Sequence, residues 1–256
     1  MSFRTVDLDY GAEKRQTTVA QGQEHELGTL GVLPDGRLFR YNFMDGAVTA
    51  GKLLQTSANV ANHDMDLVTA IAAIGATSIT VTLGATALAK DAAKDGYIYV
   101  NDLIGEGQMF KIGPHAAVDS AGSFACPIRD EGGVRTALDA TSLCGIMYNP
   151  HNNVIIAPTT PTGDIVGLTV VDRADNTYGW GMINGRHPVW IYGTVIIGRA
   201  VTRSVTTAGA VDTYPITLTE GAPNTYVPGD VIVIGEVTLI VAVTTHYGMV
   251  KFNINA

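Results

Sequence analysis

Short runs in which apolar and polar residues alternate, separated by turn signals, are the dominant pattern along the chain. Residues 78–83 place Ile, Val and Leu on one side and Ser and Thr on the other, as a half-buried strand does. Residues 215–219 alternate in the same way. Further strands are expected at residues 38–41, 97–100, 108–112, 123–128, 143–148, 153–157, 165–171 and 189–197, the last broken by a bulge or bend at Gly193.

Turn signals mark the ends of these runs. Pro34-Asp35-Gly36 and Asp95-Gly96 each precede an expected strand. Gly235-Glu236 separates two apolar runs, residues 231–234 and 237–243. Glycine first in a two-residue loop is typical of a type II′ turn, so a hairpin is predicted there.

One segment shows helical spacing instead. From Ala58 to Ala73 several apolar residues fall on a partial helical stripe, and Gly75 provides a stop. The stripe consists of Val60, Met65, Leu67, Val68, Ile71 and Ile74. Many short strands with one short helix predict a mainly β fold built from sandwich or barrel lobes.

Two segments without clear periodicity suggest the domain organisation. Residues 1–26 mix charges of both signs, and we expect an N-terminal arm, either disordered or ordered on a neighbouring subunit. Residues 158–163 contain two prolines and no apolar residue, which predicts a linker or a surface loop. The expected organisation is therefore a first β-rich lobe at 27–157 and a second at 164–256.

Composition adds an expectation of assembly. Charged residues make up 16% of the chain, against about 25% in typical soluble proteins. A surface so poor in charge is either covered in an oligomer or built from Thr, Asn and Ser.

The charge balance argues against nucleic-acid binding, and the absence of long apolar runs argues against a membrane span. A net charge of −8 with scattered basic residues argues against direct nucleic-acid binding. No segment approaches the length of a membrane span, and the first residues contain no apolar signal core. We expect a soluble protein made in the cytoplasm. Cys126 and Cys144 are expected to be buried free thiols, unless the fold brings them close enough to pair.

Three clusters are candidate sites. His63-Asp64-Met65-Asp66 could bind a metal, but acidic residues at the start of the expected helix are favoured by its dipole. In Glu24-His25-Glu26 neighbouring side chains on a strand would point to opposite faces, which favours a surface role. Tyr178-Gly179-Trp180 and Trp190-Ile191-Tyr192 are expected in the core or an interface rather than on a ligand platform, with Trp190 and Tyr192 on one strand face.

Known catalytic and cofactor motifs are absent. The chain has no GxSxG elbow, no P-loop and no complete dinucleotide-binding glycine pattern. Paired carboxylates for glycoside hydrolysis are brought together only by the fold and stay open. We therefore assign no catalytic, cofactor-binding or metal-binding residue and expect a protein that is not an enzyme.

Several glycine-centred segments carry a resemblance. They are residues 35–40 (Asp-Gly-Arg-Leu-Phe-Arg), 50–55 (Ala-Gly-Lys-Leu-Leu-Gln), 75–82, 95–101, 105–108, Val166-Gly167 and Tyr178-Gly179-Trp180. In this order, over most of residues 28–200, they resemble tailed-bacteriophage virion proteins, with a broader likeness to small β-rich cement proteins.

The resemblance implies a capsid decoration protein on the virion exterior, with the major capsid protein as its partner and itself as a homotrimer. Alternatives are a tail or fibre component with a ligand-binding surface, and a hydrolase on a β scaffold. The major capsid protein itself is disfavoured, because that role usually needs a long spine helix.

Overall fold

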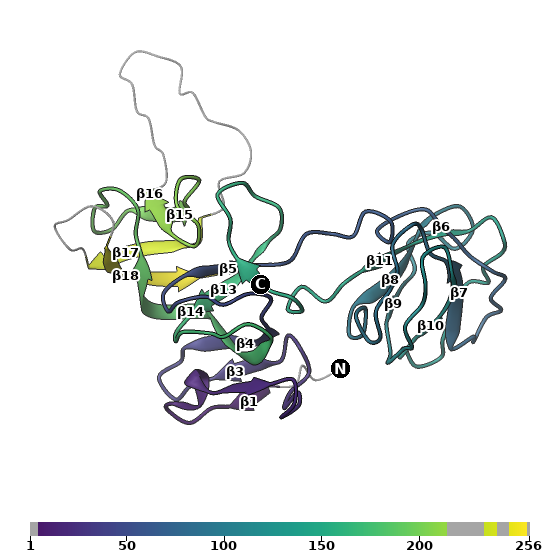
Figure 1. The fold of residues 1–256 in the computed structure, drawn as a ribbon, viewed down its shortest axis with the longest axis horizontal. Coiled ribbons are helices and arrows are strands. Elements are labelled where there is room, and N and C mark those ends of the chain that lie inside the picture. The colour runs from purple at the N-terminus through teal and green to yellow at the C-terminus, as the bar shows by residue number, and fades with distance from the viewer. Residues whose placement is uncertain (1–4, 214–232, 240–245, 255–256) are drawn as a thin grey trace, which may run out of the picture. The chain divides into compact units, whose positions relative to one another are not determined.

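The computed structural model describes residues 5–213, 233–239 and 246–254, and their regular structure is almost entirely strand (Figure 1). The prediction of a mainly β protein is confirmed. The chain folds as two compact units: unit 1 is residues 1–57 and 151–256, and unit 2 is residues 58–150, inserted between them. This division differs from the expected one, because residues 158–163 connect two strands of unit 1 instead of separating two lobes.

Unit 1 is built on one twelve-stranded sheet. Its main path runs β1-β3-β4-β14-β18-β17-β15-β16, and β2, β5, β12 and β13 branch from it. The strands are β1 (Thr5–Asp7), β2 (Gln16–Thr18), β3 (Leu30–Val32), β4 (Leu38–Phe43), β5 (Leu53–Gln55), β12 (Ile155–Ile156), β13 (Ile165–Thr169), β14 (Thr177–Trp190), β15 (Ala200–Arg203), β16 (Val211–Thr213), β17 (Gly235–Leu239) and β18 (Tyr247–Asn253).

The fourteen-residue strand β14 organises this sheet. Its first half pairs with β2 and β4, and its second half pairs with β18. The strand expected at 189–197 covers only its last two residues. The rest of β14 contains three glycines and Pro188, and most of its first half is buried on both faces, so no alternation marks it.

The N-terminal segment is part of unit 1, which corrects the expected arm. Strand β1 pairs in parallel with β3, and β2 pairs with β14. Between them Leu8 is only 6% exposed and a short 3-10 turn, η1 (Ala12–Lys14), packs its Glu13 inward. The carboxylate of Glu13 accepts a 2.6 Å hydrogen bond from the Gly11 amide. Residues 5–18 are therefore held by sheet pairing within their own chain.

Unit 2 is a closed antiparallel barrel. Its four-stranded sheet runs β6 (Leu67–Val68), β11 (Leu143–Met147), β8 (Tyr97–Asp102), β9 (Met109–Lys111), and its two-stranded sheet pairs β7 (Ser78–Thr82) with β10 (Ser123–Pro127). Bridges between Thr69 and Val81 and between Ile112 and Ile128 join the two sheets at both edges. Closure removes free sheet edges. The strands alternate as predicted, for example Ile79 and Val81 inward from β7.

The helix expected at 58–73 is wrong. Asp66 adopts a left-handed conformation with φ of 58°, which no α-helix tolerates, and Leu67–Val68 is a short strand instead. Met65 and Ile71, assigned to the buried stripe, are 58% and 79% exposed. Leu67 of the expected stripe is buried, and the bridge-forming Ala72, which lies outside the stripe, also points into the barrel.

Other local predictions have mixed outcomes. The turn at Pro34-Asp35-Gly36 is confirmed, with the Gly36 amide donating to the Leu33 carbonyl. The hairpin turn at Gly235-Glu236 is wrong, because both residues lie inside β17 and pair with β18. Gly193 lies beyond the end of β14, so it is no bulge within a strand. The strand expected at 215–219, the start of the run at 231–234 and the end of the run at 237–243 lie outside the described residues.

Both cysteines are free thiols in the core of unit 2, each 0% exposed. Burial raises the pKa of each to about 12, and the neighbouring Cys144 adds to the effect on Cys126. Because the thiolate is the reactive form, we expect no reaction with Ellman's reagent at neutral pH in the native protein and two reactive thiols after denaturation. Rapid labelling of the native protein, or no labelling after denaturation, would contradict this assignment.

Candidate functional site

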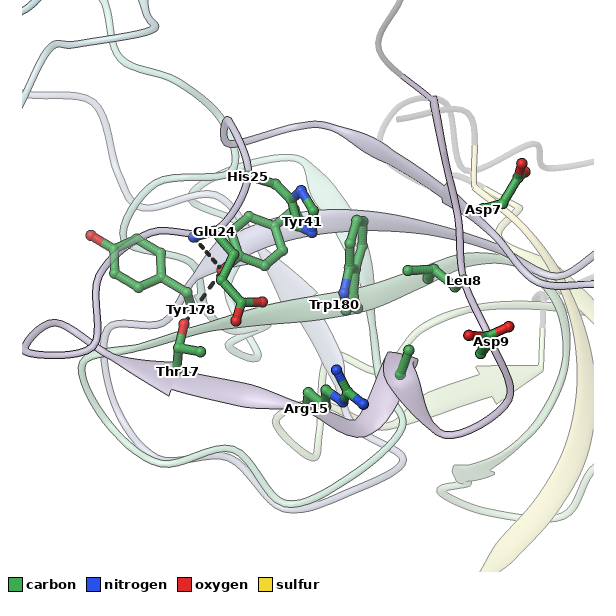
Figure 2. Close-up of a pocket in the computed structure, with 11 residues that line it drawn as sticks. Asp7, Leu8, Asp9, Arg15, Thr17, Glu24, His25, Tyr41, Tyr178 and Trp180 are labelled. Atoms are coloured by element: carbon green, nitrogen blue, oxygen red, sulfur yellow. Dashed lines mark hydrogen bonds between the residues drawn. The ribbon is translucent and has the colours of Figure 1, made fainter.

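A pocket of about 200 Å³ opens on one face of the sheet of unit 1 (Figure 2). Strands β2, β4 and β14 form its base, and the β1–η1 segment and residues 24–25 form its walls. The lining residues are Asp7, Leu8, Asp9, Ala12, Arg15, Thr17, Glu24, His25, Tyr41, Tyr178 and Trp180.

Strand register places the aromatic base of the pocket. Tyr178 lies opposite both Thr17 of β2 and Phe43 of β4, and Trp180 lies opposite Tyr41. Because side chains alternate along a strand, these residues share one face of the sheet. Gly31 on the neighbouring β3 leaves space for the Trp180 ring, since a Cβ there would lie 2.8 Å from it.

The glycines of the Tyr-Gly-Trp-Gly run lie on the opposite face of β14, where neighbouring side chains leave no room for a Cβ. A Cβ on Gly179 would lie 2.9 Å from the Arg173 guanidinium carbon, and one on Gly181 would lie 2.6 Å from the Asn42 amide nitrogen. Arg173 is 2% exposed and donates to Asn42 Oδ1 at 3.2 Å and to the Thr177 carbonyl at 3.1 Å. Burial lowers the pKa of Arg173 to about 10. This polar pair fixes β14 against β4 from behind the pocket.

The aromatic rings of the pocket are in contact, and the Tyr41 ring packs edge to face against both His25 and Trp180. Tyr41 and Trp180 have centroids 5.0 Å apart, and the His25 ring lies 5.1 Å from Tyr41 and 5.3 Å from Trp180. Burial raises the pKa of Tyr41, so its hydroxyl stays protonated at neutral pH. That hydroxyl accepts a 3.3 Å hydrogen bond from the Glu24 amide, which positions residues 24–25 over the rings.

The rim carries charged groups without partners. Asp7, Asp9, Arg15 and Glu24 are exposed, and their side chains make no ion pair or hydrogen bond within the described part of the chain. Three carboxylates and one guanidinium leave a net rim charge of −2.

The indole N–H of Trp180 is also unpartnered. Trp180 is 4% exposed, yet its N–H donates no hydrogen bond to any described residue. Figure 2 shows its nitrogen edge pointing into the pocket on the side of Arg15. The pocket thus offers free donors and free acceptors around an aromatic base.

The sequence predictions for these residues are partly confirmed. Trp180 packs in the core as expected, but it also lines the pocket. Glu24 and His25 both reach the pocket while Glu26 does not, because residues 24–25 form a bend and the alternation of a strand does not apply. Asp7, Asp9 and Arg15 were missed; they belong to the segment assigned to an arm, and no local pattern placed them.

The remaining candidates have structural roles. His63 is fully buried and contacts the Tyr148 hydroxyl at 2.7 Å and the Thr86 carbonyl at 2.8 Å. With no helix there, the expected helix-dipole role of the acidic residues is wrong. Among the described residues no group of three His, Cys, Asp or Glu side chains could hold a metal.

The second aromatic cluster lies elsewhere in unit 1. Trp190 is the last residue of β14 and packs against Tyr247 and under the Lys52 ammonium, 4.3 Å from the ring centroid. Tyr192 lies beyond the strand, so the two aromatic residues do not share a strand face.

No family model, curated protein or solved structure matches the chain. None of its described residues forms a helix that is long and apolar enough to span a membrane.

Proposed function

We propose that this protein is a structural component of a virion that decorates the outer surface of a phage capsid and stabilises contacts between capsomers. The supporting observation is the apolar surface of unit 2. Eight large apolar side chains there are between 44% and 79% exposed: Met65, Val68, Ile71, Ile74, Leu103, Ile104, Met109 and Met147. Exposed apolar surface of this extent is typical of surfaces that become covered in an assembly.

Three of these residues occupy one face of the four-stranded sheet. Leu67, Ile146 and Phe110 point into the barrel, so their neighbours Val68, Met147 and Met109 point outward. We call Val68, Met109 and Met147 the outer apolar face. Docking this face on a capsomer would stabilise the contact by removing apolar area from water.

Charge is compatible with this location. The net charge of −8 would keep the protein away from packaged DNA, and the low charged fraction of 16% suits a chain whose surface is partly covered. The resemblance to tailed-phage virion proteins points in the same direction. A homotrimer, the commonest arrangement at a threefold position, is the oligomeric state we propose.

Lysine substitutions on the outer apolar face test this function. We expect the double variant Val68→Lys/Met147→Lys to bind particles assembled without this protein at least about tenfold more weakly, because each substitution puts a charge where apolar area should be buried. The measurement is co-sedimentation with such particles. Val205→Lys, at a more exposed apolar position of unit 1 (68% exposed), is the matched control and should bind normally.

Cryo-electron microscopy of the virion locates the protein directly. Density bridging capsomers on the outer surface is the expected result. Density at the tail would favour a tail or fibre component, and absence from the particle would overturn the structural role.

A glycoside hydrolase is the second candidate function. The observation favouring it is that Asp7, Asp9 and Glu24 gather at one pocket, since glycoside hydrolysis uses two carboxyl groups. However, a general acid for this reaction needs a carboxyl group in apolar surroundings, and all three are exposed. Release of reducing sugar from oligosaccharides, abolished by Glu24→Gln, would establish the hydrolase.

A further inference from the structure

We propose that the pocket of unit 1 binds a single saccharide ring. The lining presents acceptors and donors that the fold leaves free: the carboxylates of Asp7, Asp9 and Glu24, the guanidinium of Arg15 and the indole N–H of Trp180. Hydroxyl groups both donate and accept, so a polyhydroxylated ligand satisfies both sets at once.

Trp180 provides the observation that is independent of the charged rim. A side chain that is 4% exposed has lost most of its contact with water, yet its only donor has no partner among the described residues. The nitrogen atom itself is not among the fully buried side-chain atoms that lack a partner in the described residues, so it is reached from the pocket. Figure 2 shows the nitrogen edge pointing into the pocket, where water or a hydroxyl group of a ligand can accept its hydrogen bond.

The charges favour a saccharide over simple ions. An organic cation would suit the three carboxylates, but Arg15 would repel it and the Trp180 N–H would find no acceptor. An anion would suit Arg15 and Trp180, but the carboxylates would repel it. A neutral ring bearing hydroxyl groups meets none of these conflicts.

The size of the pocket suits a ligand of about one ring. Its volume is about 200 Å³. It lies below the range of about 300–1,000 Å³ that is typical of sites for drug-sized molecules. Leu8 and the edges of the aromatic rings provide apolar contact for the C–H groups of the ring.

Two variants that each remove one charge distinguish a saccharide from a cation or an anion, because the affinity of each ligand class changes in a different direction. Glu24→Gln and Arg15→Gln each replace a charged side chain that makes no hydrogen bond within the described residues, so folding should not change. A saccharide loses affinity in both variants, by about tenfold each, as for a hydrogen bond to a charged group. A cation loses affinity with Glu24→Gln and gains it with Arg15→Gln, and an anion does the reverse.

Trp180 itself reports binding. The experiment follows the Trp180 indole N–H signal by NMR in a Trp190→Phe background, which leaves one tryptophan. The probes are the methyl glycosides of glucose, galactose and N-acetylglucosamine, together with methylguanidinium chloride and sodium acetate. Asp119→Asn, an exposed carboxylate of unit 2, is the matched control and should not change any affinity.

We expect a saturable shift with at least one methyl glycoside and weaker binding in both pocket variants. No saturable shift with any of the three glycosides would overturn the proposal. A stronger response to methylguanidinium in Arg15→Gln, or to acetate in Glu24→Gln, without glycoside binding would also overturn it and identify a charged ligand instead. The proposal does not rest on the capsid role, which particle binding and microscopy test separately.

Discussion

Replacing Gly179 by valine is expected to destabilise unit 1 by about 3–5 kcal/mol, enough to unfold much of it at room temperature. Valine has a higher strand propensity than glycine, so propensity alone predicts the opposite sign. The added atoms, however, would overlap the Arg15 carbonyl and the Arg173 guanidinium, each 2.9 Å from a Cβ at this position. Arg173 would have to move, leaving Asn42 Oδ1 and the Thr177 carbonyl buried without their donor.

The two units carry separate probes for this test. Both tryptophans lie in unit 1 and both cysteines lie in unit 2. In Gly179→Val we expect the urea midpoint followed by tryptophan fluorescence to fall sharply while thiol protection persists. Gly179→Ala should show the same change to a smaller degree. Unchanged tryptophan fluorescence and midpoint in the valine variant would contradict the packing argument.

Replacing Gly145 by valine is expected to destabilise unit 2 by about 2–4 kcal/mol. The Tyr99 ring crosses over Gly145 on the outer side of the barrel, and its hydroxyl donates a 2.5 Å hydrogen bond to the Asp64 carbonyl. A side chain at 145 would occupy the space of both the ring and that carbonyl. The ring would be displaced and its hydrogen bond lost.

Thiol exposure under increasing urea measures this effect. The midpoint for Cys126 and Cys144 should fall in Gly145→Val, while the tryptophan midpoint of unit 1 stays in place. Gly113→Ala is the matched control, because a Cβ there lies 3.5 Å from Pro127, an ordinary contact. We expect it to change stability by less than about 0.5 kcal/mol. Equal behaviour of the two variants would refute a specific role for Gly145.

Strands were predictable where one face is buried and the other meets solvent. In β7 the alternation of Ile79 and Val81 with Ser and Thr reflects that environment directly. Much of β14 is buried on both faces, and its glycines leave space for Arg173, which precedes the strand, and for Asn42 of the distant β4. The order of apolar and polar residues in β14 therefore does not predict a strand by itself. The helix failed for a similar reason: one left-handed residue, Asp66, overrides the spacing of the apolar residues around it.

The pocket could be predicted only in part. The sequence identifies Tyr-Gly-Trp as an aromatic cluster and Glu24-His25 as a polar one. No local pattern predicts that the two clusters line the same pocket. Their meeting depends on the pairing of β4 with β14 and on the contacts of Glu24 and His25 with Tyr41 of β4. Pairings between segments so far apart in the chain leave no signature in either segment alone.

The pairing of Gln55 with Ile155 means that the inserted barrel leaves and re-enters unit 1 through neighbouring strands. The barrel is therefore inserted at a single point of unit 1. Its gain, loss or replacement would alter the connection between β5 and β12 and none of the strand pairings in the larger sheet. A short turn between β5 and β12 would close the gap that its removal leaves. Evolution could thus change the surface of the barrel while the pocket of unit 1 stays intact.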